Sequence, residues 1–92
     1  MVIRQEKWTL FFTNSALKDA KKLVSCGLNK KIDKILNILE ENPYQNPPPF
    51  EKLSGDLRGA YSRRINIHHH IVYDIDNSSH TITIYRMFTH YA

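Results

Sequence analysis

Three consecutive prolines, Pro47 to Pro49, divide this chain of 92 residues into two parts with different apolar periodicities. Proline lacks a backbone N–H group and its ring fixes φ, so neither a helix nor a central strand can run through this segment. Before the prolines, apolar residues recur at helical spacing, and after them apolar and polar residues alternate. We therefore predict an extended, rigid loop over residues 46–50, with helices before it and strands after it.

The part before the prolines predicts one strand and two helices. Residues 8–12, WTLFF, are apolar enough for a buried strand. A first helix is capped within residues 13–15 and ends near Gly27, and its apolar positions are Leu17, Ala20, Leu23 and Val24. A second helix is capped by Asn29 and ends before residues 42–43, Asn-Pro, and its apolar positions are Ile32, Ile35, Leu36 and Leu39. The short connection between them predicts an antiparallel helical hairpin.

The part after the prolines predicts three strands. They cover residues 57–65, 68–75 and 81–85 with a continuation toward the end, and turns are expected at residues 66–67 and 76–79. The fold class is therefore α+β: a strand, a two-helix hairpin, then a three-stranded antiparallel meander. The hairpin covers one face of a mostly antiparallel sheet and leaves the other face open. A chain of this size holds one core, so residues 1–92 form a single domain.

Composition restricts the partners and the location of the chain. The formal net charge is +4, which mildly favours an anionic partner such as nucleic acid, an acidic protein or a membrane surface. Cys26 is the one cysteine, so no intrachain disulfide can form, and no apolar run is long enough to span a membrane. The amino terminus lacks the features of a signal peptide, so we expect a cytoplasmic protein. Lysines on the two helices form either a solvated face or a phosphate-tracking surface: Lys18, Lys21, Lys22, Lys30, Lys31 and Lys34.

Three consecutive histidines, His68 to His70, stand at the start of the second predicted strand. Alternation puts His69 on the core side with Ile71, Tyr73 and Ile75, and it puts His68 and His70 on the open face. The histidines on that face form a metal site, hold a bound anion, or are solvated. A zinc site would need further ligands from Cys26, His80 or His90, which lie elsewhere in the sequence. The spacing is therefore a poor signal for metal.

Several spaced segments together resemble the YoeB/Txe toxins of the RelE superfamily. They are Glu51-Lys52-Leu53, Leu57 with Gly59, Tyr61-Ser62-Arg63-Arg64-Ile65, His69 with Ile71-Val72-Tyr73, and the terminal His90-Tyr91. Trp8, the lysine-rich helices and the proline loop extend the resemblance, more weakly, over nearly the whole chain. The resemblance implies a RelE-like fold and a toxin of a type II toxin–antitoxin system. Such a toxin is an endoribonuclease that enters the ribosomal A site, cuts the messenger there and so inhibits translation.

The same resemblance implies the chemistry and the partners. The RNA 2′-hydroxyl attacks its own phosphate, which leaves a 2′,3′-cyclic phosphate and a free 5′-hydroxyl, and no metal or other cofactor is needed. An antitoxin of the YefM/Axe type is implied as the inhibitor, with the ribosome and messenger RNA as further partners. A homodimer is also implied.

Catalytic roles follow from the matched positions. Glu51 stands at the position of the general base, and His90 suits the general acid because an unperturbed imidazole has a pKa near ~6.5. Arg64 is available to stabilise the charged phosphorane. Tyr91 stacks on a base or orients the phosphate. Without the resemblance, Glu51 could pair with a neighbouring cation, and the last residues could be a frayed tail.

Two further cations, Lys52 and Arg63, are candidates for contacts to RNA or phosphate. Arg63 and Arg64 are adjacent in a predicted strand and therefore point to opposite faces, so at most one of them is catalytic. We favour Arg64 as the catalytic arginine. Arg63 then contacts ribosomal RNA or forms an ion pair.

Three positions depart from the family's pattern. His70 stands where the family has an arginine that is implied to contact the scissile phosphate. Phe88 stands where a basic residue is usual, and Ala92 follows a tyrosine that is often the last residue. Arginine is always charged and donates in a fork, whereas histidine donates once per nitrogen. Either His70 is a working substitute, with activity that falls as pH rises past neutrality, or the change attenuates catalysis, whether by natural drift or by deliberate mutation.

Two other function classes compete with the ribonuclease. A binding module on the same scaffold, like the ParE branch that acts on a topoisomerase, would lack the constellation of Glu51, His90 and Tyr91. A metal-dependent nuclease would need a carboxylate cluster for Mg²⁺, which the sequence does not offer.

Overall fold

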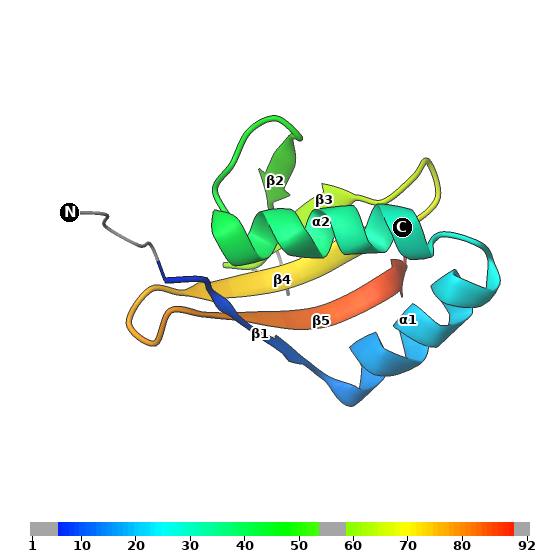
Figure 1. Ribbon diagram of the computed structural model, residues 1–92, viewed down its shortest axis with the longest axis horizontal. Coiled ribbons are helices and arrows are strands. Elements are labelled where there is room, and N and C mark those ends of the chain that lie inside the picture. The colour runs from blue at the N-terminus through cyan, green and yellow to red at the C-terminus, as the bar shows by residue number, and fades with distance from the viewer. Residues whose placement is uncertain (1–5, 54–58, 90–92) are drawn as a thin grey trace.

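The computed structural model of the protein describes residues 6–53 and 59–89, which form a sheet covered on one face by two helices (Figure 1). The elements in chain order are β1 (Thr9–Phe12), α1 (Asn14–Ser25), α2 (Asn29–Glu41), β2 (Phe50–Lys52), β3 (Tyr61–Arg64), β4 (His70–Asp76) and β5 (Thr81–Thr89). The five strands lie in the order β1-β5-β4-β3-β2. β1 pairs parallel with β5 and the other neighbours are antiparallel. The predicted α+β fold is confirmed.

Both ends of α1 have the capping interactions that the sequence predicts. The Thr13 hydroxyl accepts a hydrogen bond from the Ala16 N–H group at 3.1 Å. At the other end Gly27 has a φ of +80°, a conformation that glycine adopts without steric cost. The Leu28 N–H group donates to the Leu23 carbonyl at 3.0 Å, which is the long bond of a Schellman motif. This tight turn leads directly into α2.

The predicted cap of α2 is wrong by one residue. Asn29 is the first helical residue and Leu28 is the N-cap, with no side-chain cap bond. Asn29 cannot cap because the turn at Gly27 already places it inside the helix. The predicted end is confirmed, since α2 ends at Glu41, and its buried face contains the predicted Ile32, Ile35 and Leu39.

The predicted apolar face of α1 is partly wrong. Leu17 and Val24 are 49% and 54% exposed, whereas the buried residues of this helix are Ala16, Asp19 and Leu23. The reason is Asp19, whose carboxylate accepts hydrogen bonds from the Arg86 Nε–H group at 2.7 Å and the Met87 N–H group at 3.0 Å. A buried carboxylate with these donors is stable, so a polar residue occupies the face that apolar spacing alone assigns to leucine and valine.

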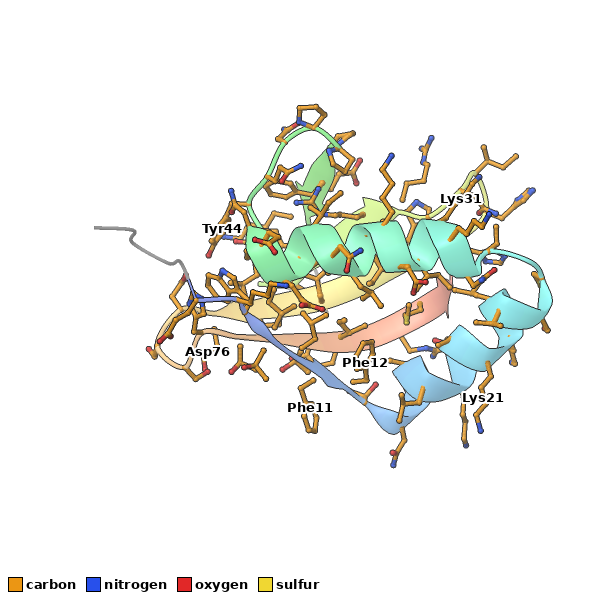
Figure 2. All side chains as sticks on the ribbon, viewed as in Figure 1. Phe11, Phe12, Lys21, Lys31, Tyr44 and Asp76 are labelled. Atoms are coloured by element: carbon orange, nitrogen blue, oxygen red, sulfur yellow. The ribbon has the colours of Figure 1, made fainter. Side chains whose placement is uncertain are left out.

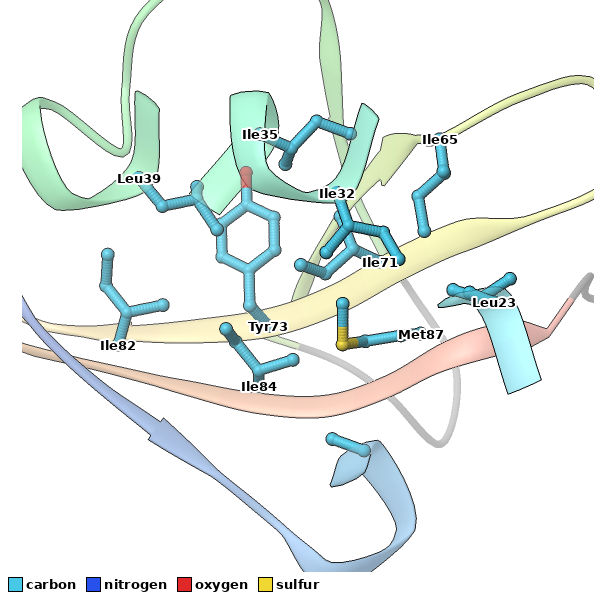
Figure 3. Close-up of a cluster of buried hydrophobic side chains, with 11 residues drawn as sticks. Leu23, Ile32, Ile35, Leu39, Ile65, Ile71, Tyr73, Ile82, Ile84 and Met87 are labelled. Carbon is cyan, nitrogen blue, oxygen red and sulfur yellow. The ribbon is translucent and has the colours of Figure 1, made fainter. Parts of the chain in front are cut away.

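The core lies between the two helices and the covered face of the sheet (Figure 3). Tyr73 and Ile84 are directly paired across β4 and β5, and both are fully buried. Their neighbours in the cluster are Ala16, Leu23, Ile32, Ile35, Leu39, Ile65, Ile71, Ile82 and Met87. Strand alternation correctly predicted Ile71 and Tyr73 as core residues.

β2 is a strand that the sequence analysis did not predict. Phe50, expected at the end of the proline loop, begins this strand and pairs with Arg63 on β3. β3 begins at Tyr61, later than the predicted residue 57, and residues 54–58 lie outside the described part of the chain. A three-residue edge strand directly after prolines gives almost no periodic signal, so pairing with β3 is what defines it.

The turn between β3 and β4 holds two of the three histidines. The Asn66 side-chain oxygen accepts hydrogen bonds from the N–H groups of His68 and His69, both at 2.8 Å. This Asx turn forms the connection between β3 and β4, so β4 begins at His70 rather than at His68 as predicted. The prediction that His69 lies in the strand is therefore wrong, and its side chain is half-buried in the turn. None of the helices in the described part of the chain is long and apolar enough to cross a membrane.

Candidate active site

A pocket of about 610 Å³ opens where β2, β3 and β4 meet the turn between β3 and β4. Three of the residues predicted to act on RNA line it, namely Glu51, Arg64 and His70. The other lining residues are Lys31, Pro48, Pro49, Phe50, Ser62, Ile65, Asn66 and Ile67. The pocket lining thus combines charged and hydrogen-bonding groups with apolar groups.

Strand register brings these three residues to one face of the sheet. Arg64 pairs with His70, and Ser62, two residues before Arg64, pairs with Glu51. Residues two apart on a strand share a face, and cross-strand partners share a face as well. Glu51, Arg64 and His70 therefore project from three adjacent strands toward the same side, opposite to the core.

A fourth charged residue, Lys31, reaches the pocket from the first turns of α2. Figure 2 shows Lys31 near the turn between β3 and β4, whereas Lys21 projects away from α1 on the other side of the molecule. The sequence grouped both with the other helical lysines, because nothing in helical spacing tells which lysine faces a pocket built by distant strands. Tertiary packing alone identifies Lys31.

The chemistry of this group of side chains suits a phosphodiester. Glu51 and Arg64 are exposed and His70 is half-buried, so all three are accessible to a ligand. A carboxylate can accept a proton from a hydroxyl, and the fixed charges of Arg64 and Lys31 can hold an anion beside it. A pocket with this composition can bind a phosphate group and deprotonate a neighbouring hydroxyl.

Lys52 lies outside this pocket. It pairs with Tyr61 on β3 and so lies on the opposite face of β2 from Glu51. Its side chain is exposed, which leaves it accessible to a partner, but it is not among the residues that line the pocket.

Arg63 does not lie on any exposed face, in contrast to its predicted contact with RNA. It is 1% exposed, and its Nε–H group donates to the Tyr73 hydroxyl at 2.9 Å. The remaining guanidinium bonds go to the carbonyl oxygens of Pro48 at 2.6 Å, and of Pro43 and Gln45 at 2.8 Å each. The protein therefore occupies four of the five N–H groups of this side chain. Burial raises the pKa of Tyr73 above its ordinary 10.0, although the positive charge of Arg63 opposes the shift.

The end of β5 lies beside the pocket. Thr89, the last described residue, pairs with His70 at the first position of β4. Register shifts interrupt the pairing of β4 and β5 between His70 and Tyr73, next to the Asp19 carboxylate that binds the Met87 N–H group. The predicted catalytic residues His90 and Tyr91, and the departure at Ala92, lie outside the described residues.

Among the described residues, the side chains considered for a zinc site do not come together. Within residues 6–53 and 59–89, no three histidine, cysteine, aspartate or glutamate side chains group closely enough to hold a metal ion. His80 lies in the turn between β4 and β5, where its ring stacks on Trp8 at 3.8 Å and its Nε2 contacts the Glu6 carbonyl at 3.0 Å. Cys26 lies at the end of α1.

Comparison with solved structures gives the same fold in several bacterial toxins. A YoeB/ParE toxin from Agrobacterium tumefaciens has a TM-score of 0.81 and 26% identity, over 90% of this chain and 99% of that one. The toxin in a heterotetrameric YoeB–YefM toxin–antitoxin complex from Staphylococcus aureus has a TM-score of 0.76 and 32% identity, over 92% of this chain and 99% of that one. A YoeB dimer from the same organism is 31% identical over the same shares, with a TM-score of 0.76.

The comparison with curated proteins gave no match. The comparison with protein families did give one. The model of the YoeB-like toxin of bacterial type II toxin–antitoxin systems matches residues 12–91, which include the strands and the helices around the pocket. With this match and the shared fold, the chain belongs to the YoeB-like toxins of bacterial type II toxin–antitoxin systems, within the RelE/ParE superfamily.

Proposed function

We propose that this toxin is a ribosome-dependent endoribonuclease that cuts messenger RNA in the ribosomal A site and thereby inhibits translation. The observation that carries the proposal is the pocket in which Glu51, Arg64 and His70 meet on one face of the sheet. Family membership supports the same function. Three of the residues that the resemblance assigned to the site, Glu51, Arg64 and His70, share one face of the sheet.

The proposed reaction is attack of a ribose 2′-hydroxyl on the adjacent phosphate. Glu51 accepts the hydroxyl proton while the 2′-oxygen forms a bond to phosphorus. The bond between phosphorus and the 5′-oxygen then breaks, and His90 donates a proton to the departing oxygen. The products are a 2′,3′-cyclic phosphate and a free 5′-hydroxyl, and DNA is not a substrate because it lacks the attacking hydroxyl.

Cations stabilise the phosphorane that forms during this attack. Arg64 is proposed to contact its equatorial oxygens directly, since it lines the pocket beside His70. Lys31 adds a second fixed charge from α2, and His70 adds a donor at the position where the family has arginine. Lys52 is proposed to contact the RNA backbone outside the pocket, because it is exposed next to Glu51.

His90 and Tyr91 complete the proposed machinery. They follow Thr89 in the sequence, and Thr89 pairs with His70 at the edge of the pocket. His90 is proposed as the general acid and Tyr91 as the group that stacks on a base or orients the phosphate.

An antitoxin of the YefM type is the proposed inhibitor, since a YoeB homologue from Staphylococcus aureus was crystallised in a complex with YefM. A homodimer is proposed on the same basis, from the dimer of that homologue. Because the proposed substrate is messenger RNA on the translating ribosome, the proposed location is the cytoplasm.

The chemistry is tested by the ends of the RNA products. Purified ribosomes carrying a defined messenger are mixed with the toxin, and the downstream fragment is offered to a polynucleotide kinase. We expect labelling without prior phosphatase treatment, because attack by the 2′-hydroxyl leaves a free 5′-hydroxyl. Fragments with 5′-phosphates would instead indicate attack by water, and would contradict the proposed roles of Glu51 and His90.

A further inference from the structure

We infer that Arg63 is a positioning residue that holds the proline loop, and through it Glu51, at the pocket. Arg63 does not itself line the pocket and is 1% exposed, but it contacts Pro48 and Phe50, which do line it. The inference rests on the proposed function of Glu51, and it assigns a role to the arginine that does not face RNA.

The loop between α2 and β2 is the segment that Arg63 holds. Three of its carbonyl oxygens, at Pro43, Gln45 and Pro48, accept hydrogen bonds from the two terminal nitrogens of the guanidinium. Prolines supply no N–H groups, so this loop has few donors with which to pair its own carbonyls. The guanidinium provides the donors that a neighbouring strand would otherwise provide, and buried carbonyls need such partners.

The same guanidinium is tied to the core and to β2. Its Nε–H group donates to the hydroxyl of Tyr73, which is fully buried among the residues of β4 and α2. Its central carbon lies 4.8 Å from the centroid of the Phe50 ring, and Phe50 is the cross-strand partner of Arg63. Arg63 therefore contacts the loop before Glu51, the residue immediately preceding Glu51, and the core.

This arrangement requires the shape of arginine. The four acceptors surround the planar group, and a planar fork with five N–H donors can reach all of them at once. A lysine ammonium is a compact group with three donors and cannot reproduce the contacts. Arg63→Lys therefore keeps the charge but frees part of the loop, and the carboxylate of Glu51 loses its fixed position.

The effect on catalysis is expected to pass through Glu51 alone. A shift of the base by about 1 Å lowers the rate of such a reaction by about 100-fold. We therefore expect Arg63→Lys to slow single-turnover cleavage on programmed ribosomes by ~10- to 100-fold when Glu51 is present. In the Glu51→Gln background the same substitution should change the rate by less than about twofold, because the group that Arg63 positions is already gone.

Arg86→Lys is the matched control for this double-mutant cycle. Arg86 is also an arginine with bonds to the protein, but its partner is Asp19 on α1, outside the pocket. We expect Arg86→Lys to change the cleavage rate by the same small factor with and without Glu51. If Arg63→Lys slows cleavage by equal factors in the two backgrounds, Arg63 does not act through Glu51 and the inference is overturned.

Hydrogen exchange on the free toxin tests the inference without any cleavage. We expect Arg63→Lys to accelerate exchange of the amides of Tyr44, Gln45 and residues 50–53, while amides of β1 and β5 keep their protection. If the wild-type toxin cuts no RNA but this local change is seen, the proposed function fails and the clamp on the loop stands. If exchange in the loop is unchanged, the clamp is wrong whatever the cleavage result.

Tyr73→Phe provides a second variant should Arg63→Lys fail to fold. It removes only the bond between the Tyr73 hydroxyl and the Arg63 Nε–H group. We expect faster exchange at the same loop amides, and a loss of cleavage that again disappears in the Glu51→Gln background. Unchanged loop exchange in this variant would also overturn the inference.

Discussion

Arg64 on β3 and His70 on β4 are direct cross-strand partners, and both line the pocket that contains Glu51. By the resemblance, His70 departs from the family's pattern and Arg64 keeps it. The fixed positive charge of Arg64 lies beside the histidine, so under the proposed function the site keeps a cation for a phosphate even though His70 replaces the implied arginine. The effect of this replacement on catalysis can be measured directly.

His70→Arg should raise the rate of messenger cleavage by ~10- to 1000-fold if the histidine attenuates the toxin, since that is the range for one charged transition-state donor. The measurement is single-turnover cleavage on programmed ribosomes. His68→Arg is the matched control, because His68 is exposed in the preceding turn and does not line the pocket. An unchanged rate for His70→Arg would contradict attenuation and would identify His70 as a functional substitute.

Glu51→Gln should lower the cleavage rate by ~10²- to 10⁴-fold, the usual contribution of a general base. The fold should be unaffected because Glu51 is exposed on a short edge strand. Glu41→Gln is the control, since Glu41 is an exposed glutamate at the end of α2 that lies 3.5 Å from Lys7, outside the pocket. Equal rates for the two variants would remove Glu51 from the mechanism.

Lys31→Gln should raise the ribosome concentration needed for half-maximal cleavage by ~10-fold and reduce its dependence on salt, as expected for the loss of one phosphate contact. Lys30→Gln is matched in charge, helix and exposure, but Lys30 does not line the pocket. A titration of programmed ribosomes at two salt concentrations separates the variants. The same shift in both would mean that the lysines act only through net charge.

Stability should fall above about pH 10, partly because of Tyr73. Its pKa is raised by burial in the folded state, so the folded protein holds this proton more tightly than the unfolded chain. The stabilisation is fully present below the unfolded pKa, near ~10, and is lost as the pH rises through the folded pKa. Urea unfolding between pH 8 and pH 11 measures the change.

Tyr73→Phe should reduce this loss of stability at alkaline pH. It does not abolish it, because burial also raises the pKa of Tyr85, with a contribution from Asp74. An identical pH dependence in the wild type and in Tyr73→Phe would contradict the assignment to Tyr73.

Local patterns predicted the elements of the fold well, and long-range contacts account for the errors. Alternation identified Ile71 and Tyr73 as core residues because a strand with one covered face imposes a period of two. Helical spacing failed for the face of α1, where Asp19 is buried against donors from β5, 67 and 68 residues away in the sequence. No local pattern reports such a partner.

In the candidate site, too, the sequence predicted some residues and long-range contacts account for what it missed. Resemblance selected Glu51 and Arg64, and register explains why they share a face. Alternation correctly placed Arg63 and Arg64 on opposite sides of β3, but it could not tell that Arg63 points inward. An arginine can be buried here because the proline loop presents carbonyls to it, and those acceptors lie 15 to 20 residues earlier in the chain. The sequence analysis did not single out Lys31, and the reason is similar. Lys31 reaches the pocket from α2, far from the strands in the sequence.

The most direct test of the central claim compares the same messenger with and without ribosomes. The toxin is added to a translating extract and to the naked messenger, and the 5′ ends are mapped, with Glu51→Gln as the control of reduced activity. We predict cuts at A-site codons only when ribosomes are present, and cleavage at least ~100-fold slower with the variant. Cuts in the naked messenger at equal rates, or no cuts in either sample even with His70→Arg, would contradict a ribosome-dependent ribonuclease built around Glu51.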